Sequence, residues 1–463
     1  MAYYILKSYK LNVEPFLVFS ALRNEKNCFF LDSSLTSNLL GRYSFLGIDP
    51  FLVIKTKGEY PYRQLREILN RYKFFAPKLS LPFTGGAMGY LAYDLGQPFK
   101  KEAEKKNNVG LDIPDSLFGF YNSAVIIDHF KRSLYVFSIG FPETNYRLAR
   151  MLCESNFKKI NRALAKIGSA QDYKKRDEPK SGTLKLDSSF SKEGYLSAVR
   201  KAKQYIKEGD IYQVNLSQSF RTKSSLPGFD IYKRLRDISP SCFSSYFDAG
   251  DFQILSSSPE SFLRLEGDRV TTRPMKGTRP RSRNKSDDLR LRNELWKSAK
   301  DKAELLMIVD LERNDLGKVC GYDSIKVRVL RQIEQYNTVF QTTATVEGRL
   351  HKDKDRIDLL RACFPGGSIT GCPKIRSMEI IEELEPTRRF IYTGSLGYLS
   401  FSGGMDFNIL IRTILKKRDS LYFGVGGGIV ADSNPEDEYS ETLVKAKAMI
   451  QAISKNGRFK TIG

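Results

Sequence analysis

The chain has 463 residues, 41% of them hydrophobic, which is enough to bury a large core. Its formal net charge of +22 is spread along the whole sequence without a nucleic-acid-binding motif, so nucleic acid is not the expected partner. No run of about 18 apolar residues predicts a membrane span, and no signal peptide is expected. The six cysteines form no CxxC pair, which favours free thiols in a reducing cytoplasm.

The first part of the chain alternates short β-type runs with turns. Residues 28–31 and 124–127 are examples, rich in aromatic or branched apolar side chains. Residues 171–180 are polar and charged and contain a proline, which is typical of an exposed linker. The sequence therefore predicts an N-terminal region over residues 1–165 and a linker over residues 166–190.

Helices and strands alternate in the second predicted region, residues 191–455. Ser191 is a suitable N-cap for a helix whose apolar residues recur at helical spacing until Gly209. A strand-like run follows at residues 211–216. Because this mixture continues to the end of the region, the expected fold class is α/β or α+β.

One lysine stands in an unusual local sequence. Lys276 lies in a turn bracketed by proline and glycine, directly after a strand-like run, and Glu260 precedes it in a Ser-Ser-Pro-Glu segment. A lysine amine held near a carboxylic acid suits covalent catalysis, in which the amine attacks and the acid protonates a leaving group. Either residue alone would be interpreted as an ordinary side chain, since the chain contains 75 lysines and arginines.

Histidine chemistry is largely excluded. The chain has only two histidines, His129 and His351, and neither lies in a metal-ligand or nucleophile pattern. Zinc sites of the usual kind, Cys–His hydrolysis and histidine general bases are therefore not expected. A metal would have to be held by carboxylates, which favours Mg²⁺.

Carboxylates occur at suitable spacing on two predicted helices. Asp301 and Glu304 are three residues apart, and Glu438 and Glu441 repeat that spacing near the end of the region, followed by Lys445. Either helix alone would be interpreted as a solvated surface. Two such faces that converge would hold one Mg²⁺.

Anion-binding elements lie between these carboxylates in the sequence. Residues 364–374 form a glycine-rich turn with the hydroxyls of Ser368 and Thr370, leading into a predicted helix. The glycines of residues 425–430 allow a ligand to approach the backbone closely. Arg412 ends a strand-like run and can pair with a carboxylate through two hydrogen bonds.

Together these segments resemble the chorismate-utilising enzymes, a family that includes anthranilate, aminodeoxychorismate, isochorismate and salicylate synthases. Residues 41–47 also resemble the family's N-terminal region. The resemblance implies the anthranilate synthase component I-like fold, with large β-sheets in a sandwich flanked by helices. The matching segments of the second region follow the family's order and are residues 213–218, 258–260, 307–315, 365–378, 392–398, 405–409 and 426–441.

Two positions distinguish the reactions within this family. Lys276 stands where aminodeoxychorismate synthases carry lysine and anthranilate synthases typically carry alanine. Gln213 stands where the isochorismate and salicylate enzymes carry a water-activating lysine. Both imply amination of chorismate to aminodeoxychorismate. Three alternatives remain: anthranilate formation, alone or in a dual-purpose enzyme; a non-catalytic basic binding protein with this fold; and a Schiff base between Lys276 and pyridoxal phosphate.

The resemblance also implies roles for individual residues. Lys276 would attack the ring and Glu260 would protonate the leaving hydroxyl, while a separate glutamine amidotransferase subunit would supply ammonia. Mg²⁺ would be held by Glu304 and Glu441, supported by Glu438 and Asp301. The residues implied to bind chorismate are Gln213, Ser368, Tyr392, Arg412, Gly426, Gly428 and Lys445.

A second ligand site follows from the same resemblance, because some family members bind tryptophan in their N-terminal half. The Pro-Ser-Cys-Phe sequence here differs from the Pro-Ser-Pro-Tyr of feedback-regulated members, which argues against control by tryptophan. Gln341 replaces a histidine found in many members, so no role of that histidine is carried over. The positions that match the tryptophan site are Ser33, Arg42, Tyr43, Ser44, Phe45, Cys242, Phe243 and Ser244.

Overall fold

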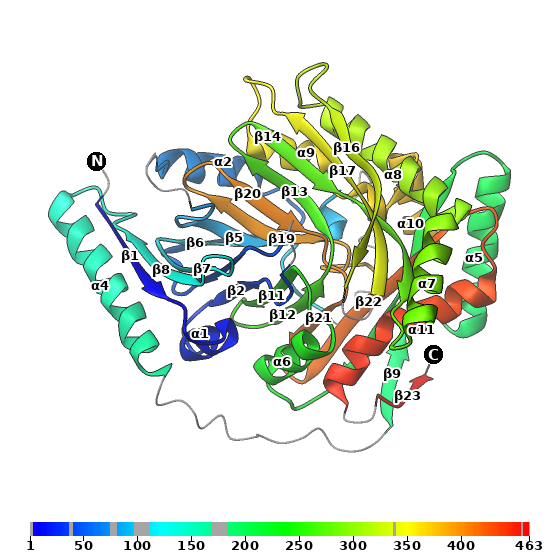
Figure 1. Ribbon diagram of the computed structural model, residues 1–463, viewed down its shortest axis with the longest axis horizontal. Coiled ribbons are helices and arrows are strands. Elements are labelled where there is room, and N and C mark those ends of the chain that lie inside the picture. The colour runs from blue at the N-terminus through cyan, green and yellow to red at the C-terminus, as the bar shows by residue number, and fades with distance from the viewer. Residues whose placement is uncertain are drawn as a thin grey trace.

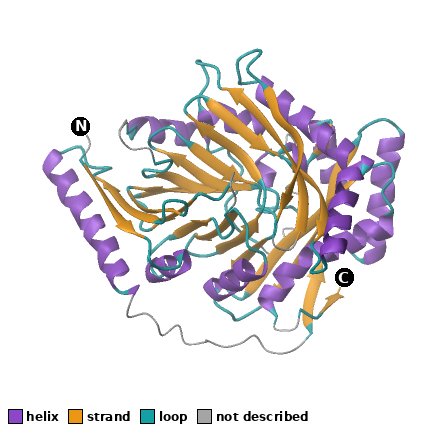
Figure 2. Ribbon diagram, viewed as in Figure 1, coloured by secondary structure: helices purple, strands orange, loops and turns teal. Residues whose placement is uncertain are grey.

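The computed structural model has a mixed α/β fold, in which strands fill the centre and helices cover the outside (Figures 1 and 2). This confirms the expected fold class. No helix in the described part of the chain is both long and apolar enough to cross a membrane. The structure describes residues 3–36, 40–74, 81–96, 111–167, 183–336, 339–454 and 457–462.

The larger sheet of the described residues has thirteen strands. Its neighbours are antiparallel except β9 and β23, which run parallel. In spatial order the strands are β1 (Tyr4–Lys10), β8 (Ser133–Ile139), β7 (Ser123–Asp128), β3 (Tyr43–Gly47), β2 (Phe29–Asp32), β11 (Phe243–Asp248), β12 (Gln253–Ser258), β21 (Thr413–Lys417), β22 (Ser420–Ile429), β10 (Gln213–Lys223), β9 (Leu184–Ser188) and β23 (Phe459–Ile462), with β18 (Gly371–Cys372) beside β10.

The second sheet of the described residues has ten strands and lies against the first. Its strands in order are β15 (Met275–Pro280), β17 (Val339–Arg349), β14 (Arg269–Arg273), β13 (Ser261–Glu266), β20 (Met405–Asn408), β19 (Ser395–Ser400), β5 (Gly86–Leu91), β6 (Ser116–Tyr121) and β4 (Leu52–Thr56), with β16 (Lys326–Gln335) beside β17.

Helices cover the outer faces of both sheets (Figure 1). They are α1 (Pro15–Leu22), α2 (Tyr62–Arg71), α4 (Tyr146–Ala165), α5 (Lys192–Lys207), α6 (Gly228–Ile238), α7 (Lys285–Lys297), α8 (Ala299–Gly317), α9 (Arg356–Cys363), α10 (Lys374–Leu384) and α11 (Pro435–Ile453), with short 3₁₀ turns at Tyr93–Gly96 and Gly367–Ile369.

The predicted capped helix at Ser191 is present as α5. The Ser191 hydroxyl accepts a hydrogen bond from the backbone N–H of Gly194, so the side chain satisfies an end group that the helix leaves free. Leu196, Val199 and Ala202 are buried on one face. The strand predicted at residues 211–216 begins two residues later, as β10.

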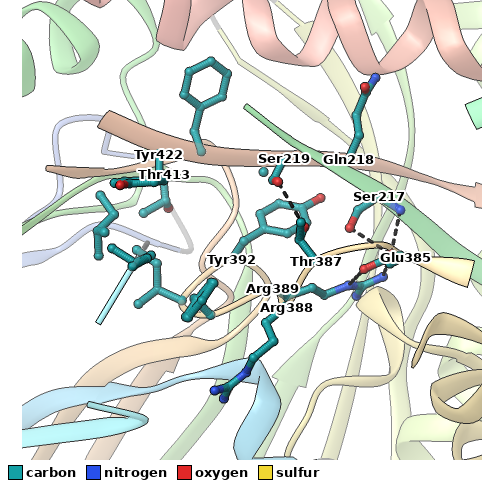
Figure 3. Close-up of a pocket in the computed structure, with 16 residues that line it drawn as sticks. Ser217, Gln218, Ser219, Glu385, Thr387, Arg388, Arg389, Tyr392, Thr413 and Tyr422 are labelled. Carbon is teal, nitrogen blue, oxygen red and sulfur yellow. Dashed lines mark hydrogen bonds and ion pairs between the residues drawn. The ribbon is translucent and has the colours of Figure 1, made fainter. Parts of the chain in front are cut away.

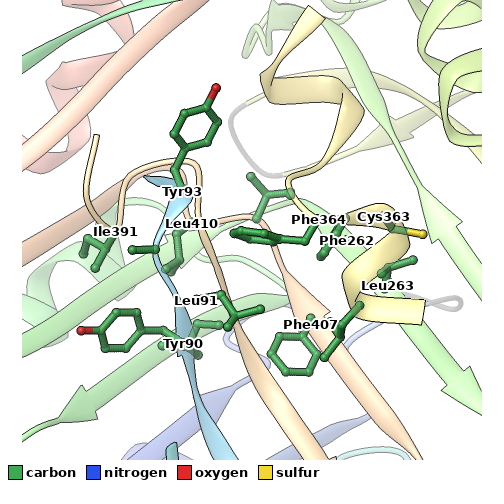
Figure 4. Close-up of a cluster of buried hydrophobic side chains, with 14 of the residues drawn as sticks. Tyr90, Leu91, Tyr93, Phe262, Leu263, Cys363, Phe364, Ile391, Phe407 and Leu410 are labelled. Carbon is green, nitrogen blue, oxygen red and sulfur yellow. The ribbon is translucent and has the colours of Figure 1, made fainter. Parts of the chain in front are cut away.

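Alternation of side chains fixes how the thirteen-stranded sheet packs. Phe29 and Ile254 belong to the core between the two sheets, whereas the next residues, Phe30 and Leu255, belong to a second core. Because successive side chains of a strand point to opposite faces, both faces of this sheet are buried. Helices α1, α6 and α11 cover the second core. Figure 4 shows part of the first, including Leu91.

Strands from both predicted regions occur in both sheets. In the larger sheet β2 pairs with β11, and in the smaller sheet β5 pairs with β19. Residues 184–188 of the predicted linker form β9. Residues 168–182 of that linker lie outside the described residues, so the division of the chain at 166–190 stays a prediction.

Candidate functional site

Lys276 and Glu260 meet at the glycine-rich turn. Lys276, on β15, donates a hydrogen bond from Nζ to the carbonyl oxygen of Ser368, at 3.1 Å. Glu260, between β12 and β13, lies beside the Ser368 side chain and the backbone of Met275, which act to lower its pKa. The two residues singled out in the sequence therefore lie beside the same serine.

Burial shifts both groups toward their uncharged forms. It raises the pKa of Glu260 to about 6, although the Ser368 hydrogen bond and the Lys276 charge oppose the shift. Burial also lowers the pKa of Lys276, although the charges of Glu304 and Glu260 oppose it. A neutral amine beside a neutral acid is the combination that nucleophilic attack with proton donation requires.

Gln213 lies beside Lys276 at the start of β10. A Cβ atom on Gly428 would lie 2.5 Å from Gln213 Nε2 and 3.7 Å from Lys276 Nζ, so the absence of a side chain at Gly428 is necessary here. Both polar atoms of the buried Gln213 amide lack a hydrogen-bond partner within the described residues. Buried polar atoms are normally paired, so this amide is suited to contact a ligand.

The acidic helices α8 and α11 approach the same place. A Cβ on Gly427 would lie 3.1 Å from Glu438 Oε2, 3.7 Å from Glu441 Oε1 and 4.0 Å from Lys445 Nζ. Lys445 pairs with Glu441 at 2.7 Å and donates to the carbonyl of Gly426 at 2.9 Å. Three residues of the expected site therefore lie over the glycines of β22.

The carboxylates suit a cation without forming a complete cage. In the part of the chain described, no three His, Cys, Asp or Glu side chains are arranged to hold a metal ion. Burial raises the pKa of both Glu304 and Glu438, and the negative charge of a neighbouring carboxylate adds to each shift. A divalent cation would remove this repulsion, and carboxylate oxygens are ligands that Mg²⁺ accepts. Asp301 instead pairs with Arg279, at 3.2 Å.

Tyr392 and Arg412 lie on the side of β21 and β22. A Cβ on Gly424 would lie 2.3 Å from the Tyr392 ring, so this glycine allows the ring to pack on the strand. Among the described residues, the Arg412 guanidinium donates a single long hydrogen bond, 3.4 Å, to Ser239. Burial lowers its pKa, and no described carboxylate forms an ion pair with it. A guanidinium in this position is suited to an anionic ligand.

Several buried charged residues were missed by the sequence interpretation. Arg389 and Glu385 form an ion pair behind the turn, and Lys374 pairs with Asp315 beneath it. Figure 3 shows Glu385, Arg389 and Tyr392 around a small cavity of about 40 Å³. A signal was available, because all four charged residues lie in or near the quoted segments, but their spacing did not reveal that they are buried.

A second, larger cavity lies between β2–β3 and β13–β20 and has a volume of about 740 Å³. The Ser44 hydroxyl bonds to His129 and accepts from the backbone of Ser33, so Ser44 is not in the lining. Burial raises the pKa of Asp406 in the wall to about 6. Tryptophan binding here stays a prediction. The expected residues that line the cavity are Ser33, Arg42, Tyr43, Phe45, Cys242, Phe243 and Ser244.

Comparison with known proteins places this geometry in a family. Residues 26–451 match the model of the chorismate binding enzymes. Anthranilate synthase component 1 of Acetivibrio thermocellus is 36% identical, over 96% of this chain and 94% of the relative. Aminodeoxychorismate synthase component 1 of Bacillus subtilis is also 36% identical, over 89% of each chain.

Solved structures of similar proteins agree with this match. The crystal structure of anthranilate synthase component I from Streptococcus pneumoniae matches with a TM-score of 0.77 and 30% identity, over 95% of this chain and 98% of that one. The menaquinone-specific isochorismate synthase of Escherichia coli, at 18% identity and a TM-score of 0.73 over 98% of this chain and 95% of that one, shares the fold. The chain therefore belongs to the family of chorismate-binding enzymes.

Proposed function

We propose that this chain is the chorismate-aminating component of an aminodeoxychorismate synthase, which forms 4-amino-4-deoxychorismate for p-aminobenzoate and folate synthesis. The observation that supports this most is the Lys276 amine, hydrogen-bonded to Ser368 beside the acid Glu260. A buried lysine with a lowered pKa is a competent nucleophile, whereas the alanine typical of anthranilate synthases is not.

The proposed reaction uses both groups twice. The neutral Lys276 amine bonds to ring C2, the ring double bonds shift, and the C4–O bond breaks as Glu260 gives its proton to the departing oxygen, which leaves as water. Ammonia then bonds to C4, the double bonds shift back, and the bond between C2 and Lys276 breaks. The proton lost by the incoming ammonia restores Glu260 to its acid form.

Gln213 supports amination over hydroxylation. An amide cannot act as a base, so it cannot activate water as a lysine at this position would. Its unpaired oxygen and nitrogen, noted above for the described residues, can accept from and donate to a small nucleophile such as ammonia. Arg412 and Tyr392 would hold one carboxylate of chorismate, and Ser368, Lys445 and the β22 glycines the other.

Magnesium is the proposed cofactor. Glu304, Glu438 and Glu441 would hold it, because the charge of Glu438 acts to raise the pKa of Glu304 and the charge of Glu441 acts to raise that of Glu438, so the three carboxylates lie near one another. When bound, the ion would neutralise and orient the ring carboxylate. Asp301 would contribute only if it left its ion pair with Arg279.

The proposed partner is a glutaminase subunit that supplies ammonia. The two relatives described above are each component 1 of their synthase. The two histidines are His129, bonded to Ser44, and His351, which is exposed near Asp353, so neither is placed for glutamine hydrolysis. A cytoplasmic location is proposed because all six cysteines are free thiols.

Anthranilate synthase is the second candidate, because most of the relatives found carry that name. A product assay separates the two. The purified chain is given chorismate, a magnesium salt and an ammonium salt at alkaline pH, and the products are resolved by chromatography. We expect aminodeoxychorismate, which an added lyase converts to p-aminobenzoate. Anthranilate as the main product would overturn the proposal.

The covalent step has its own test. A Lys276→Ala variant should lose turnover, while Lys233→Ala, which removes a surface lysine paired with Asp237, should not. If Lys276→Ala kept the wild-type rate, the covalent step would be wrong even if the product were aminodeoxychorismate. Visible absorbance from a bound aldehyde cofactor in the purified protein would instead favour Schiff-base chemistry.

A further inference from the structure

The position of Ser368 depends on the glycine-rich turn that contains it. Its carbonyl oxygen accepts a hydrogen bond from Lys276 Nζ at 3.1 Å and its side chain lies beside Glu260, so the turn at residues 364–370 influences the positions of both reacting groups. This turn contains two glycines and only one short 3₁₀ segment, Gly367–Ile369. Its own local structure therefore provides little rigidity.

Two buried cations hold the carbonyl groups of this turn. Arg389 Nη1 donates to the carbonyl of Ile369 at 2.9 Å, one residue after Ser368. On the other side, Lys374 Nζ donates to the carbonyls of Pro365 at 2.7 Å and Cys363 at 3.1 Å. The turn is thus fixed at both of its ends.

Each cation has a buried carboxylate partner. Arg389 binds Glu385 through two hydrogen bonds, at 2.9 and 2.6 Å, and their side chains are 2% and 3% exposed (Figure 3). Lys374 pairs with Asp315, and these side chains are 11% and 4% exposed. Buried ion pairs contribute little net stability, since desolvation offsets their attraction. A requirement for exact geometry is a better explanation of their presence.

Arg389 also contacts two segments of the chain outside the turn. Its Nη2 donates to the carbonyl of Asn215 at 2.6 Å, two residues from Gln213, and its Nη1 contacts the Thr393 hydroxyl at 3.3 Å, next to Tyr392. The same guanidinium therefore touches three segments that carry site residues. Lysine has no planar fork and cannot make this set of contacts at once.

We propose that Arg389 and Lys374, each held by its buried carboxylate, are positioning residues that fix the glycine-rich turn and thereby align Lys276 with Glu260. Neither contacts the reacting groups directly. The inference rests on the proposed function only in taking Lys276 and Glu260 as those groups, and it predicts defects in turnover whichever product is formed.

The test compares Arg389 with its neighbour in the sequence. Arg388 also forms a largely buried pair, with Asp94 at 3.2 Å and Asp115 at 2.9 Å, and makes no hydrogen bond to the turn among the described residues. Arg389→Met and Arg388→Met therefore remove matched buried cations. For each folded variant, kcat and KM for chorismate consumption and the melting temperature are measured, and the acetylation rate of Lys276 is followed by peptide mass spectrometry.

Arg389→Met should lower kcat by at least about 10-fold and change KM by less than about threefold, because displacement of a reacting group by about 1 Å costs up to about 10²-fold in rate. It should also change the acetylation rate of Lys276 relative to other lysines. Arg388→Met should lower the melting temperature similarly but keep kcat within about twofold and leave Lys276 acetylation unchanged. Lys374→Met should resemble Arg389→Met, and Lys374→Arg should recover part of kcat.

Equal kcat values for Arg389→Met and Arg388→Met would overturn the inference, as would an unchanged acetylation rate of Lys276. If Arg389→Met does not fold, Arg389→Lys replaces it: an intermediate kcat supports the inference and a wild-type kcat contradicts it. Lys276→Ala, assayed in parallel, separates the two proposals. If that variant loses turnover while Arg389→Met does not, only the positioning role fails.

Discussion

The site around Lys276 and the larger cavity around Asp406 contain the same acidic feature. In each, burial raises the pKa of a carboxyl group, Glu260 or Asp406, to about 6. The two sites differ in the basic side chain that lies near the carboxyl group. Lys276 can lose its proton when buried, whereas Arg264, beside Asp406, keeps its charge under all ordinary conditions. Only the first site therefore combines its carboxyl group with an amine that can become a neutral nucleophile.

The largest effect expected from this difference is on turnover. Glu260→Gln should lower kcat by about 10²- to 10⁴-fold, because the amide cannot donate the proton that the leaving oxygen needs. The matched change Asp406→Asn should leave kcat within about twofold in the absence of tryptophan. Steady-state assays of chorismate consumption measure both, and comparable losses in the two variants would contradict the comparison.

The pH dependence of kcat/KM should also show that Glu260, and not Asp406, takes part in the reaction. The reactive pair carries one proton shared between Glu260 and Lys276, so kcat/KM should fall as the pH drops below about 6, where both groups become protonated. It should fall again when the pH exceeds the lowered pKa of Lys276 and both are deprotonated. The Asp406→Asn variant should show the same acid limb. If Asp406→Asn shifted the pH at which kcat/KM falls on the acid side, the titrating group would be Asp406 and not Glu260, against this expectation.

A smaller effect is expected from a ligand in the larger cavity. Tryptophan added well above its dissociation constant should raise the melting temperature by a few degrees, because a ligand that binds only the folded state stabilises it. Asp406→Asn should weaken this shift, since the wall loses a carboxyl group that can carry a negative charge. Turnover should not change. Strong inhibition by tryptophan would show that the cavity communicates with Lys276.

The last effect concerns Glu312, buried behind Glu260, and is on stability alone. Burial raises the pKa of Glu312 to about 8, so the folded protein loses stability as the pH rises from the unfolded-state pKa through that value. Glu312→Gln removes this titration and keeps an acceptor for the Thr272 hydroxyl, which donates to Glu312 at 2.8 Å. Its melting temperature relative to wild type should therefore be higher at pH 9 than at pH 5. A difference independent of pH would contradict the expectation.

Local patterns in the sequence predicted the local structure well. Ser191 caps α5 as expected, because capping and helical spacing depend on neighbours in the chain. The expected α/β class also follows from such patterns. The pairing of β2 with β11 was not predictable from them, because it joins residues such as Asp32 and Ser244 that are far apart in sequence.

The candidate site was predicted in outline, and mainly through resemblance. Lys276 and Glu260 were identified as a pair, and the structure places both on Ser368. The roles of Arg389 and Lys374 were not apparent, because an arginine or lysine in a chain this basic gives no sign in the sequence of being buried. Asp301 illustrates the converse: its helical spacing matched a metal ligand, but Arg279 engages it.

The strand pairing across the two predicted regions has a consequence for how the protein is made. Strand β2 can pair early with β3, and β5 with β6, but β2 gains its second partner only when β11 has been synthesised, and β5 only when β19 has, near the end of the chain. Contacts between such distant residues form slowly, since a long loop must close before they are made. On the ribosome, each of these early strands therefore lacks one of its final neighbours until its distant partner has emerged, and the reactive lysine acquires its environment only in the last stage of folding.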